Sequence, residues 1–337
     1  MLATQETGTG AMGQISTLLK AVIATSLSMQ ALLAAMFLPR FLAMGFDPVR
    51  AIWDAVFMAI SVFNNAGFVI LPDGLAPHVT DWWMLIPIIL GTTVGAIGFP
   101  VIMDVAKNLR TPRRWRLHTK LTLSTYLILA FVGALAMALT EWHNPTTLGA
   151  IDTPSKILNA MLAGVNSRSS GLSALDVGAM HSQTHFVQDI LMMIGGGSAS
   201  TAGGVKVTTF AVLVLAVIAE ARGDRDIETF GRRIPTSTIR LSVAVSLLGL
   251  ALVAISVVLL MSMTDYTLDI ILFETVSAFA TVGLSTGITP ILPVGAKYVL
   301  IFLMFAGRTG SMTVAAALAL RQRSRVIRMP EEQPIIG

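Results

Sequence analysis

One apolar unit occurs three times in this chain of 337 residues, and each copy ends in a short turn around a glycine. The units cover residues 53–71, 156–176 and 269–288, and their glycines are Gly67, Gly171 and Gly283. Each unit follows one long apolar segment and precedes another. An internal repeat constrains the whole architecture, so it outweighs any local motif. The order of helix, half-helix, turn and helix is typical of the wall of an ion-selective pore.

The composition indicates an integral membrane protein. Hydrophobic residues make up 54% of the chain and charged residues only 12%, about half the charged fraction of a soluble domain. Several apolar runs reach the ~20 residues needed to cross a bilayer. The chain has no cysteine, and its basic residues sit in short loops, which argues against thiol chemistry and nucleic-acid binding. The first residues show no basic stretch or cleavage site, so no signal peptide is expected.

Six spanning segments are predicted, with the three short units re-entering the membrane between the first and second, third and fourth, and fifth and sixth. The positive-inside rule orients them, because six basic residues lie in 107–120, five in 222–240 and four in 321–328. All three stretches fall on one side, the cytoplasm, only if each unit returns to the side it left. The C-terminus is then cytoplasmic and the protein a multi-pass protein of the cell membrane. The predicted spans are about 15–38, 82–105, 120–140, 186–219, 239–262 and 297–320.

The turns are candidate cation ligands. Each short helix points its negative carbonyl end inward, and the following backbone carbonyls can replace the hydration shell of a cation. Glycine is expected there because the turn needs either a positive φ or a close approach of neighbouring backbones. The alternative is three tight loops that only plug a cavity. The predicted selectivity filter comprises Asn64, Asn65, Ala66 and Gly67; Arg168, Ser169, Ser170 and Gly171; and Ala280, Thr281, Val282 and Gly283.

These residues resemble the potassium-uptake membrane subunits of the Trk/Ktr/HKT superfamily, most closely its bacterial KtrB- and TrkH-like members. The segments that carry the resemblance are 64–69, 166–177, 195–211, 278–288 and 307–314, in the order of that family. The resemblance implies an all-α membrane protein of tandem M1–P–M2 repeats around a pseudo-fourfold pore with re-entrant pore helices. It also implies potassium as the substrate, a homodimer in the lipid bilayer, and a cytosolic nucleotide-binding regulatory subunit of RCK/KTN type as partner. It implies neither a bound cofactor nor a metal beyond the transported cation.

The family has four such repeats, whereas three are visible here. They resemble the second, third and fourth repeats, and are expected to cover residues 1–110, 111–225 and 226–337. The first filter segment is therefore not seen, which leaves the preference between potassium and sodium open. Two alternatives to a potassium-conducting subunit stand: an N-terminally truncated, non-conducting subunit that pairs with complete ones, and a relative that conducts both sodium and potassium.

A glycine-rich loop interrupts the fourth predicted span. Glycine costs about 1 kcal/mol relative to alanine within a helix, so five glycines in ten residues end it. One interpretation is a kink that eases packing. The other, supported by the resemblance, is a movable gate below the filter, with small residues and hydroxyls that let it move at low steric cost. The predicted gate comprises Gly195, Gly196, Gly197, Ser198, Ala199, Ser200, Thr201, Ala202, Gly203 and Gly204, together with Arg308.

Arg308 lies midway along the last apolar segment, where a charge costs at least ~2.5 kcal/mol. It is predicted either to pair with Glu274 or to form a positive barrier beneath the filter that anchors the loop. Lys206 is expected to cap the loop or to snorkel. Asp176 is interpreted as a turn residue.

Enzyme chemistry is not expected. The sequence has no carboxylate pair, no Ser–His arrangement and no H-E-x-x-H motif. His181 and His185 have the spacing of one helical face, but two histidines alone do not close a metal site.

Overall fold

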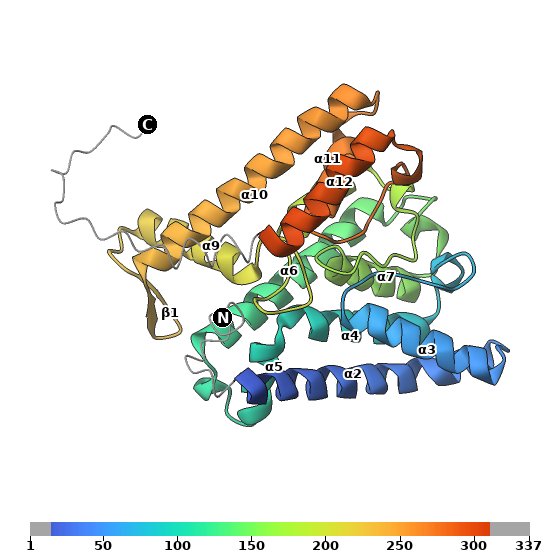
Figure 1. The fold of residues 1–337 in the computed structure, drawn as a ribbon, viewed down its shortest axis with the longest axis horizontal. Coiled ribbons are helices and arrows are strands. Elements are labelled where there is room, and N and C mark those ends of the chain that lie inside the picture. Colours follow the sequence, from blue (N-terminus) through green and yellow to red (C-terminus); the bar gives the residue numbers. More distant parts are fainter. Residues whose placement is uncertain (1–14, 311–337) are drawn as a thin grey trace.

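The computed structural model describes residues 15–310, which fold almost entirely into helices (Figure 1). A two-stranded antiparallel hairpin, β1 paired with β2, is the one sheet within these residues. Short 3-10 turns occupy Ala76–His78, Pro112–Arg114, Leu148–Ala150, Val177–Ala179 and Thr289–Ile291. The main elements are α2 (Ile15–Ala43), α3 (Pro48–Phe63), α4 (Trp82–Ile97), α5 (Phe99–Lys107), α6 (Leu117–Glu141), α7 (Thr153–Asn166), α8 (Ser182–Met193), α9 (Val207–Arg222), β1 (Ile227–Thr229), β2 (Arg232–Ile234), α10 (Thr236–Met263), α11 (Leu268–Phe279) and α12 (Val294–Phe305), followed by a π turn at Ala306–Gly310.

The three predicted half-helices are α3, α7 and α11, and local sequence explains where the first two begin. Asp47 caps α3 by accepting a hydrogen bond from the Val49 amide, and Asp152 caps α7 through the Ser155 amide. A proline lies in the first two positions of both helices, where its missing amide costs nothing. Each helix then ends directly before its glycine turn. The first two half-helices are thus defined by acidic caps at one end and by the turns at the other.

The second predicted span, 82–105, is wrong as one crossing helix. It is divided at Gly98 into α4 and α5, which meet at an angle of 95°. Gly98 has a φ of +92°, and a β-carbon there would lie 2.5 Å from the carbonyl oxygen of Ser198. The bend therefore lies directly against the glycine-rich loop, whose Ala199 carbonyl also accepts a hydrogen bond from the Phe99 amide at 3.4 Å.

The fourth predicted span is divided as well, into α8 and α9, with the loop between them. Within residues 15–310, three helices are long and apolar enough to cross a membrane, namely Leu19–Ala43, Leu117–Glu141 and Thr236–Met263. The bent pair α4 and α5 makes a fourth if it is taken as one span. The end of the sixth predicted span and the basic stretch at 321–328 lie outside the described residues.

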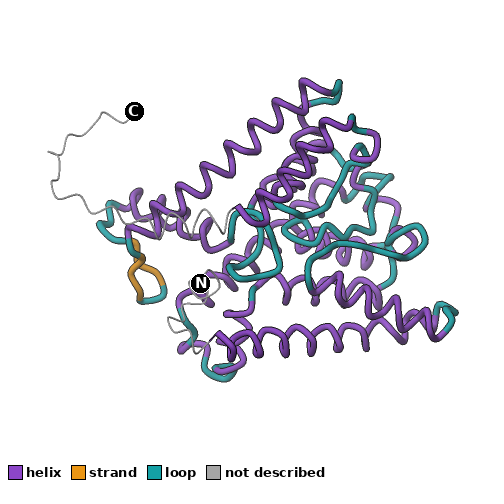
Figure 2. The backbone as a smooth tube through the Cα atoms, in the orientation of Figure 1, coloured by secondary structure: helices purple, strands orange, loops and turns teal. Residues whose placement is uncertain are grey.

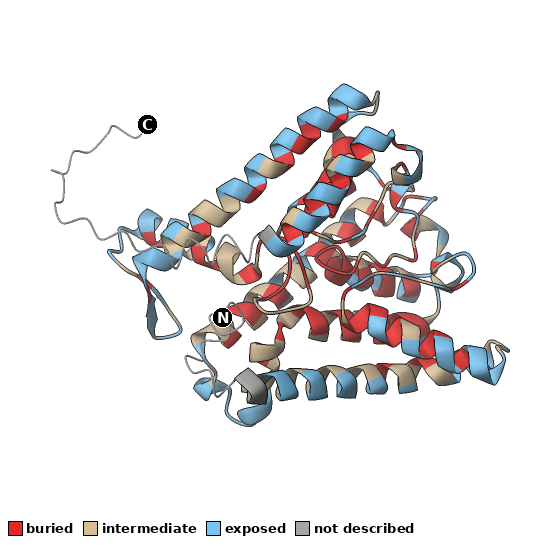
Figure 3. Cartoon of the chain, in the orientation of Figure 1, coloured by how far each residue is buried: buried red, intermediate tan, exposed pale blue. Residues whose placement is uncertain are grey.

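The units pack in sequence order. Helix α4 of the first unit packs on α7 of the second, and α8 of the second packs on α11 of the third. One hydrophobic cluster centres on α2, α3 and α4, and another joins α7 and α8 to α10, α11 and α12. Exposed apolar residues line the outer faces of α2 and α10, as expected for surfaces in contact with lipid (Figure 3). Loop segments gather between the helices rather than only at their ends (Figure 2).

Helix α7 approaches α6 closely at Gly164, which generates a stability prediction. A β-carbon at Gly164 would lie 2.4 Å from the carbonyl oxygen of Ala130 and 2.6 Å from the amide nitrogen of Ala134. We expect Gly164→Ala to force the helices apart and lower the free energy of unfolding by about 1–3 kcal/mol. Thermal unfolding in detergent measures the change.

The matched control is Gly295→Ala in α12, where an added β-carbon meets only Met263 at an ordinary 3.5 Å. This control should unfold at or above the temperature of the unmodified chain, because alanine favours a helix over glycine. Equal melting temperatures for the two variants would contradict the close-packing account.

Candidate functional site

The three glycine turns, residues 64–67, 168–171 and 280–283, lie against one another. A β-carbon at Gly67 would lie 2.1 Å from the carbonyl oxygen of Ser170, and one at Gly171 would lie 2.3 Å from that of Val282. The first turn therefore touches the second, and the second touches the third. All three glycines have positive φ, at +75°, +64° and +95°. Both expected reasons for glycine, conformation and close approach, hold at Gly67 and Gly171.

The third glycine is different, because nothing lies within 4 Å of a β-carbon added at Gly283. Gly283 is exposed, and so is Ala66 in the first turn, whereas Arg168, Ser169 and Ser170 in the middle turn are buried. The turns are therefore in contact with one another, whereas the first turn at Ala66 and the third turn at Gly283 remain exposed. We call the exposed surface at Ala66 and Gly283 the free flank.

A polar side chain in each half-helix forms a hydrogen bond to the extended segment that follows its turn. Ser61 donates to the carbonyl oxygen of Phe68 at 2.7 Å, and Ser277 donates to that of Leu284 at 2.6 Å. In the second unit Asn166 donates to the carbonyl oxygen of Leu172 at 2.7 Å. In each case the acceptor is the residue directly after the glycine. These clamps were not predicted from sequence, although one polar residue near the end of an apolar helix is a usable signal.

The turns are not identical in backbone. Asn65 and Thr281 occupy equivalent positions and share a positive φ of +52°. Ser169, at the same position of the second turn, is not among the residues with positive φ. The amides of Ala66 and Val282 donate to the carbonyls of Ser61 and Ser277, whereas in the second unit it is the Gly171 amide that donates to Asn166. The middle turn is thus shifted by one residue relative to its neighbours.

Arg168 lies in the second turn as predicted, but its side chain does not face the neighbouring turns. The side chain is completely buried, and its guanidinium carbon lies 3.6 Å from the ring centre of Tyr126 in α6. Only the backbone of Arg168 is therefore available to the site.

The glycine loop, residues 195–204, is held tightly beneath the turns. The Gly197 amide donates to the carbonyl of Ala96 at 2.7 Å, and the Gly195 amide to that of Val205 at 2.8 Å. A β-carbon at Gly203 would lie 2.1 Å from Oγ1 of Thr281 and 2.6 Å from the carbonyl oxygen of Ala280. The expectation that small residues give this loop room to move at low steric cost is wrong for this conformation. The glycines are needed because a β-carbon at Gly195, Gly196, Gly197 or Gly203 would lie 2.5 Å or less from a neighbouring atom.

Thr201 is the point where the loop meets the first turn. Its Oγ1 accepts a hydrogen bond from Nδ2 of Asn65 at 2.6 Å and lies 3.0 Å from the carbonyl oxygen of Gly95. The backbone carbonyl of Thr201 accepts a hydrogen bond from the guanidinium of Arg308. One residue thus joins the first turn, the loop and the last helix.

Glu274 does not pair with Arg308, so that alternative is wrong. The Glu274 carboxylate accepts hydrogen bonds from Ser285 at 2.7 Å, from the Thr286 amide at 2.8 Å and from Thr289 at 2.6 Å. Together with the Thr286 hydroxyl at 3.0 Å, four donors already satisfy it, and they fix the loop that follows the third turn. Arg308 itself is exposed in the π turn and reaches the glycine loop instead.

Lys206 and Asp176 make the contacts expected from the sequence, whereas His181 and His185 do not form a common site. Lys206 donates to the carbonyl of Ala202 at 2.9 Å and so caps the loop, and Asp176 accepts from the Gly178 amide in a turn. His181 lies beside Glu141, whereas His185 contacts the carbonyl of Val177, so the two rings do not converge. Within residues 15–310 no group of three or more candidate ligands could hold a metal ion.

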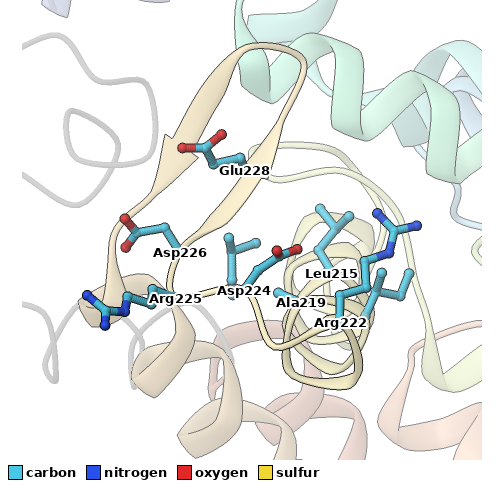
Figure 4. Close-up of a pocket in the computed structure, with 9 residues that line it drawn as sticks. Leu215, Ala219, Arg222, Asp224, Arg225, Asp226 and Glu228 are labelled. Atoms are coloured by element: carbon cyan, nitrogen blue, oxygen red, sulfur yellow. The ribbon is translucent and has the colours of Figure 1, made fainter.

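A separate pocket of about 360 Å³ lies far from the turns, between the end of α9 and the hairpin (Figure 4). Its charged residues have both signs, with Asp226 and Glu228 on the hairpin side and Arg222 on α9. Asp226 is paired with Arg233 at 2.9 Å. The mixed charges favour no single ligand, and the pocket takes no part in the arrangement of the turns.

Comparisons with known proteins agree on one family. The family model TrkH, described as a cation transport protein, matches residues 2–326. The chain is 36% identical over 337 residues to Ktr system potassium uptake protein B of Bacillus subtilis, covering all of this chain and 75% of the relative. It is 35% identical over 284 residues to the protein of that name from Vibrio alginolyticus, covering 84% of this chain and 62% of the relative. Potassium/sodium uptake protein NtpJ of Enterococcus hirae is 32% identical over 312 residues, with 90% and 67% covered.

The fold also matches a solved structure. The crystal structure of the potassium transporter TrkH from Vibrio parahaemolyticus aligns with a TM-score of 0.70 and 17% identity, over 93% of this chain and 66% of that chain. At this identity the match concerns the fold alone. It confirms the prediction of a helical membrane protein.

The contacts of Thr201 generate a second prediction. Thr201→Val removes the hydroxyl that meets Asn65 and the Gly95 carbonyl, and leaves these groups without that partner. We expect a loss of about 1–3 kcal/mol in the free energy of unfolding, measured by thermal unfolding in detergent.

Thr93→Val serves as the control, because the Thr93 hydroxyl donates to the Ile89 carbonyl of its own helix turn at 2.7 Å and is not part of the contact between the loop and the first turn. That variant should change stability by much less. A Thr201→Val protein as stable as the Thr93→Val protein would show that the hydroxyl does not anchor the loop.

Proposed function

The chain belongs to the TrkH family of cation transport proteins, and we propose that it is a pore-forming subunit for potassium uptake. The observation that carries the proposal is the contact between successive glycine turns, whose backbone carbonyls lie at the inner ends of three half-helices. Rings of backbone carbonyls replace the hydration shell of potassium in selective pores. Relatives named as potassium uptake proteins support the choice of ion.

The filter in this proposal consists of the three glycine turns. The negative carbonyl ends of α3, α7 and α11 are directed at them, which attracts a cation. A closed ring needs a further wall at the free flank, beside Gly283 and Ala66. We propose that a fourth unit of the same kind completes it, so that the three units correspond to residues 1–110, 111–225 and 226–337 of a four-unit pore. A chain without that wall would be a non-conducting partner of complete subunits.

The ion preference has a specific alternative. NtpJ, which is named a potassium/sodium uptake protein, is 32% identical to this chain. A subunit that conducts both ions is therefore the second candidate. Transport measurements with both cations separate it from a potassium-selective subunit.

We propose that the glycine loop and Arg308 together control passage below the filter. The loop packs directly beneath the third turn at Gly203, and the Arg308 guanidinium binds its Thr201 carbonyl. A positive charge at this depth opposes the passage of a cation. The regulatory partner in this proposal is a cytosolic nucleotide-binding ring of RCK/KTN type acting on a homodimer. The basic loops support an orientation with the C-terminus on the cytoplasmic side of the cell membrane.

Selectivity provides the test of the proposed filter. Gly171→Ser introduces a side chain where φ is +64° and where the Val282 carbonyl lies 2.3 Å from the β-carbon position. A strain of about 1–2 kcal/mol corresponds to roughly tenfold in an equilibrium, so we expect potassium preference over sodium to fall by about that factor. Rubidium and sodium uptake are measured in a potassium-uptake-deficient bacterium that expresses the chain, both alone and with a fourth unit fused to its N-terminus.

Gly283→Ser is the matched comparison, since its φ is +95° but no neighbour lies within 4 Å. Its effect should be smaller, unless the fused unit brings a backbone against it. Uptake ratios that stay unchanged in both variants would overturn the filter assignment. Failure of the unmodified protein to support growth at low potassium in either form would overturn potassium conduction.

Replacing Arg308 tests the proposed barrier. Arg308→Ala removes the positive charge and a charge-assisted hydrogen bond of about 1.5–3 kcal/mol to the loop. We expect potassium flux per inserted protein to rise roughly tenfold or more and to depend less on the cytosolic partner. Arg308→Lys, which keeps the charge, should stay close to the unmodified protein. Normalised flux that is the same in all three proteins would assign Arg308 to packing.

A further inference from the structure

Arg168 carries a buried charge for which the described residues offer little compensation. The side chain is 0% exposed, and Nε lies 3.4 Å from the carbonyl oxygen of Gly164, one turn back in α7. The face of Tyr126 covers the guanidinium at 3.6 Å. Neither Nη1 nor Nη2 has a hydrogen-bond partner among the described residues. No ion pair found within residues 15–310 includes Arg168.

Structural stability alone does not explain this residue. An arginine side chain keeps its proton in proteins, so the group is a permanent cation. Its stacking on a tyrosine offsets only part of the free energy that burial of a charge costs. The remaining favourable interaction is with the carbonyl end of α7, the negative end of the helix dipole. The guanidinium is therefore placed against the same carbonyl end that faces the second glycine turn.

The equivalent positions in the other two units are neutral. Counted back from the glycines, Arg168 corresponds to Asn64 and Ala280. The Asn64 side chain also folds back along its helix, and its Nδ2 donates to the carbonyl oxygen of Ile60, four residues earlier, at 2.9 Å. Asn64 and Arg168 thus contact their half-helices in the same way, each through the carbonyl four residues earlier. Asn64 is the C-terminal cap of α3, whereas Arg168 directly follows the cap of α7, Ser167, in keeping with the one-residue shift of the middle turn. The two residues differ by one unit of charge.

We infer that Arg168 is a specificity-determining residue: a fixed positive charge behind the second glycine turn that weakens the binding of cations in the filter. The inference rests on the proposed conduction of cations through the three turns. A pore conducts only if its sites bind an ion strongly enough to admit it and weakly enough to release it. Three half-helix dipoles of the same sign attract the cation, and Arg168 offsets one of them. Its side chain acts through the field and does not touch the ion.

Charge scaling gives a test that a packing role cannot reproduce. Coulomb energy is proportional to the product of the charges, so removing Arg168 affects a divalent ion twice as strongly in free energy as a monovalent ion. We expect Arg168→Met to tighten potassium binding roughly threefold to tenfold, and barium binding by roughly the square of that factor. Titration calorimetry of the purified full chain in detergent, in a buffer of large organic cations, measures both affinities.

Two further variants complete the experiment. Arg168→Lys keeps the charge and should remain within roughly twofold of the unmodified chain for both ions. Asn64→Lys adds a charge at the equivalent place in the first unit and should weaken binding, again with the larger effect on barium. This variant also decides the question if Arg168→Met does not fold, because it tests the same field at the equivalent site.

The outcomes separate the two levels of the proposal. An unmodified chain that binds neither cation overturns the proposed function and this inference with it. Binding in the unmodified chain, with potassium and barium shifted by the same factor in the variants, overturns this inference alone. So does an Arg168→Lys protein that behaves like Arg168→Met, since that result would assign Arg168 to packing against Tyr126.

Discussion

The close contact of one glycine with the carbonyl of the next turn is the constraint on which the rest of this structure depends. Gly67 meets Ser170, and Gly171 meets Val282, at distances where no β-carbon fits. Because the turns approach so closely, the half-helices that carry them converge, and the helices α4 and α8 are drawn against α7 and α11. The polar clamps from Ser61, Asn166 and Ser277 then hold the segment after each turn against its own half-helix.

The same kind of contact explains the irregular helices. The glycine loop divides α8 from α9, and it also bends the α4–α5 segment, because Gly98 meets the carbonyl of Ser198. In the π turn after α12, a β-carbon at Gly307 would lie 1.6 Å from the carbonyl oxygen of Phe279. This turn therefore reaches the end of α11 only with glycine at that position. Loop, bend and π turn are therefore parts of one close-packed layer beneath the turns. Any movement of the loop has to break its hydrogen bonds to Ala96 and Val205 together.

The three units are similar but not equivalent. The middle turn is buried and shifted by one backbone hydrogen bond, and it alone carries a charge, Arg168, against its half-helix. The outer turns expose Ala66 and Gly283 at the free flank. A pore built from such units has an uneven field around its axis. The pseudo-symmetry of the sequence repeat therefore does not extend to the electrostatics.

The sequence was sufficient for the membrane class, the three half-helices and the positions of their turns, because apolar length and glycine are local signals. It was also sufficient to locate the break at 195–204, since a run of glycines cannot remain helical. It could not show that this loop is closely packed, that it bends the second predicted span, or that Glu274 is satisfied by hydroxyls and an amide rather than by Arg308. Nor could it show that Arg168 turns away from its own turn toward Tyr126. The Glu274 contacts come from residues 11–15 positions later, which only the path of the loop brings back to the carboxylate. The others depend on a partner from a distant part of the chain, and only the packing of the helices determines which partners come within reach.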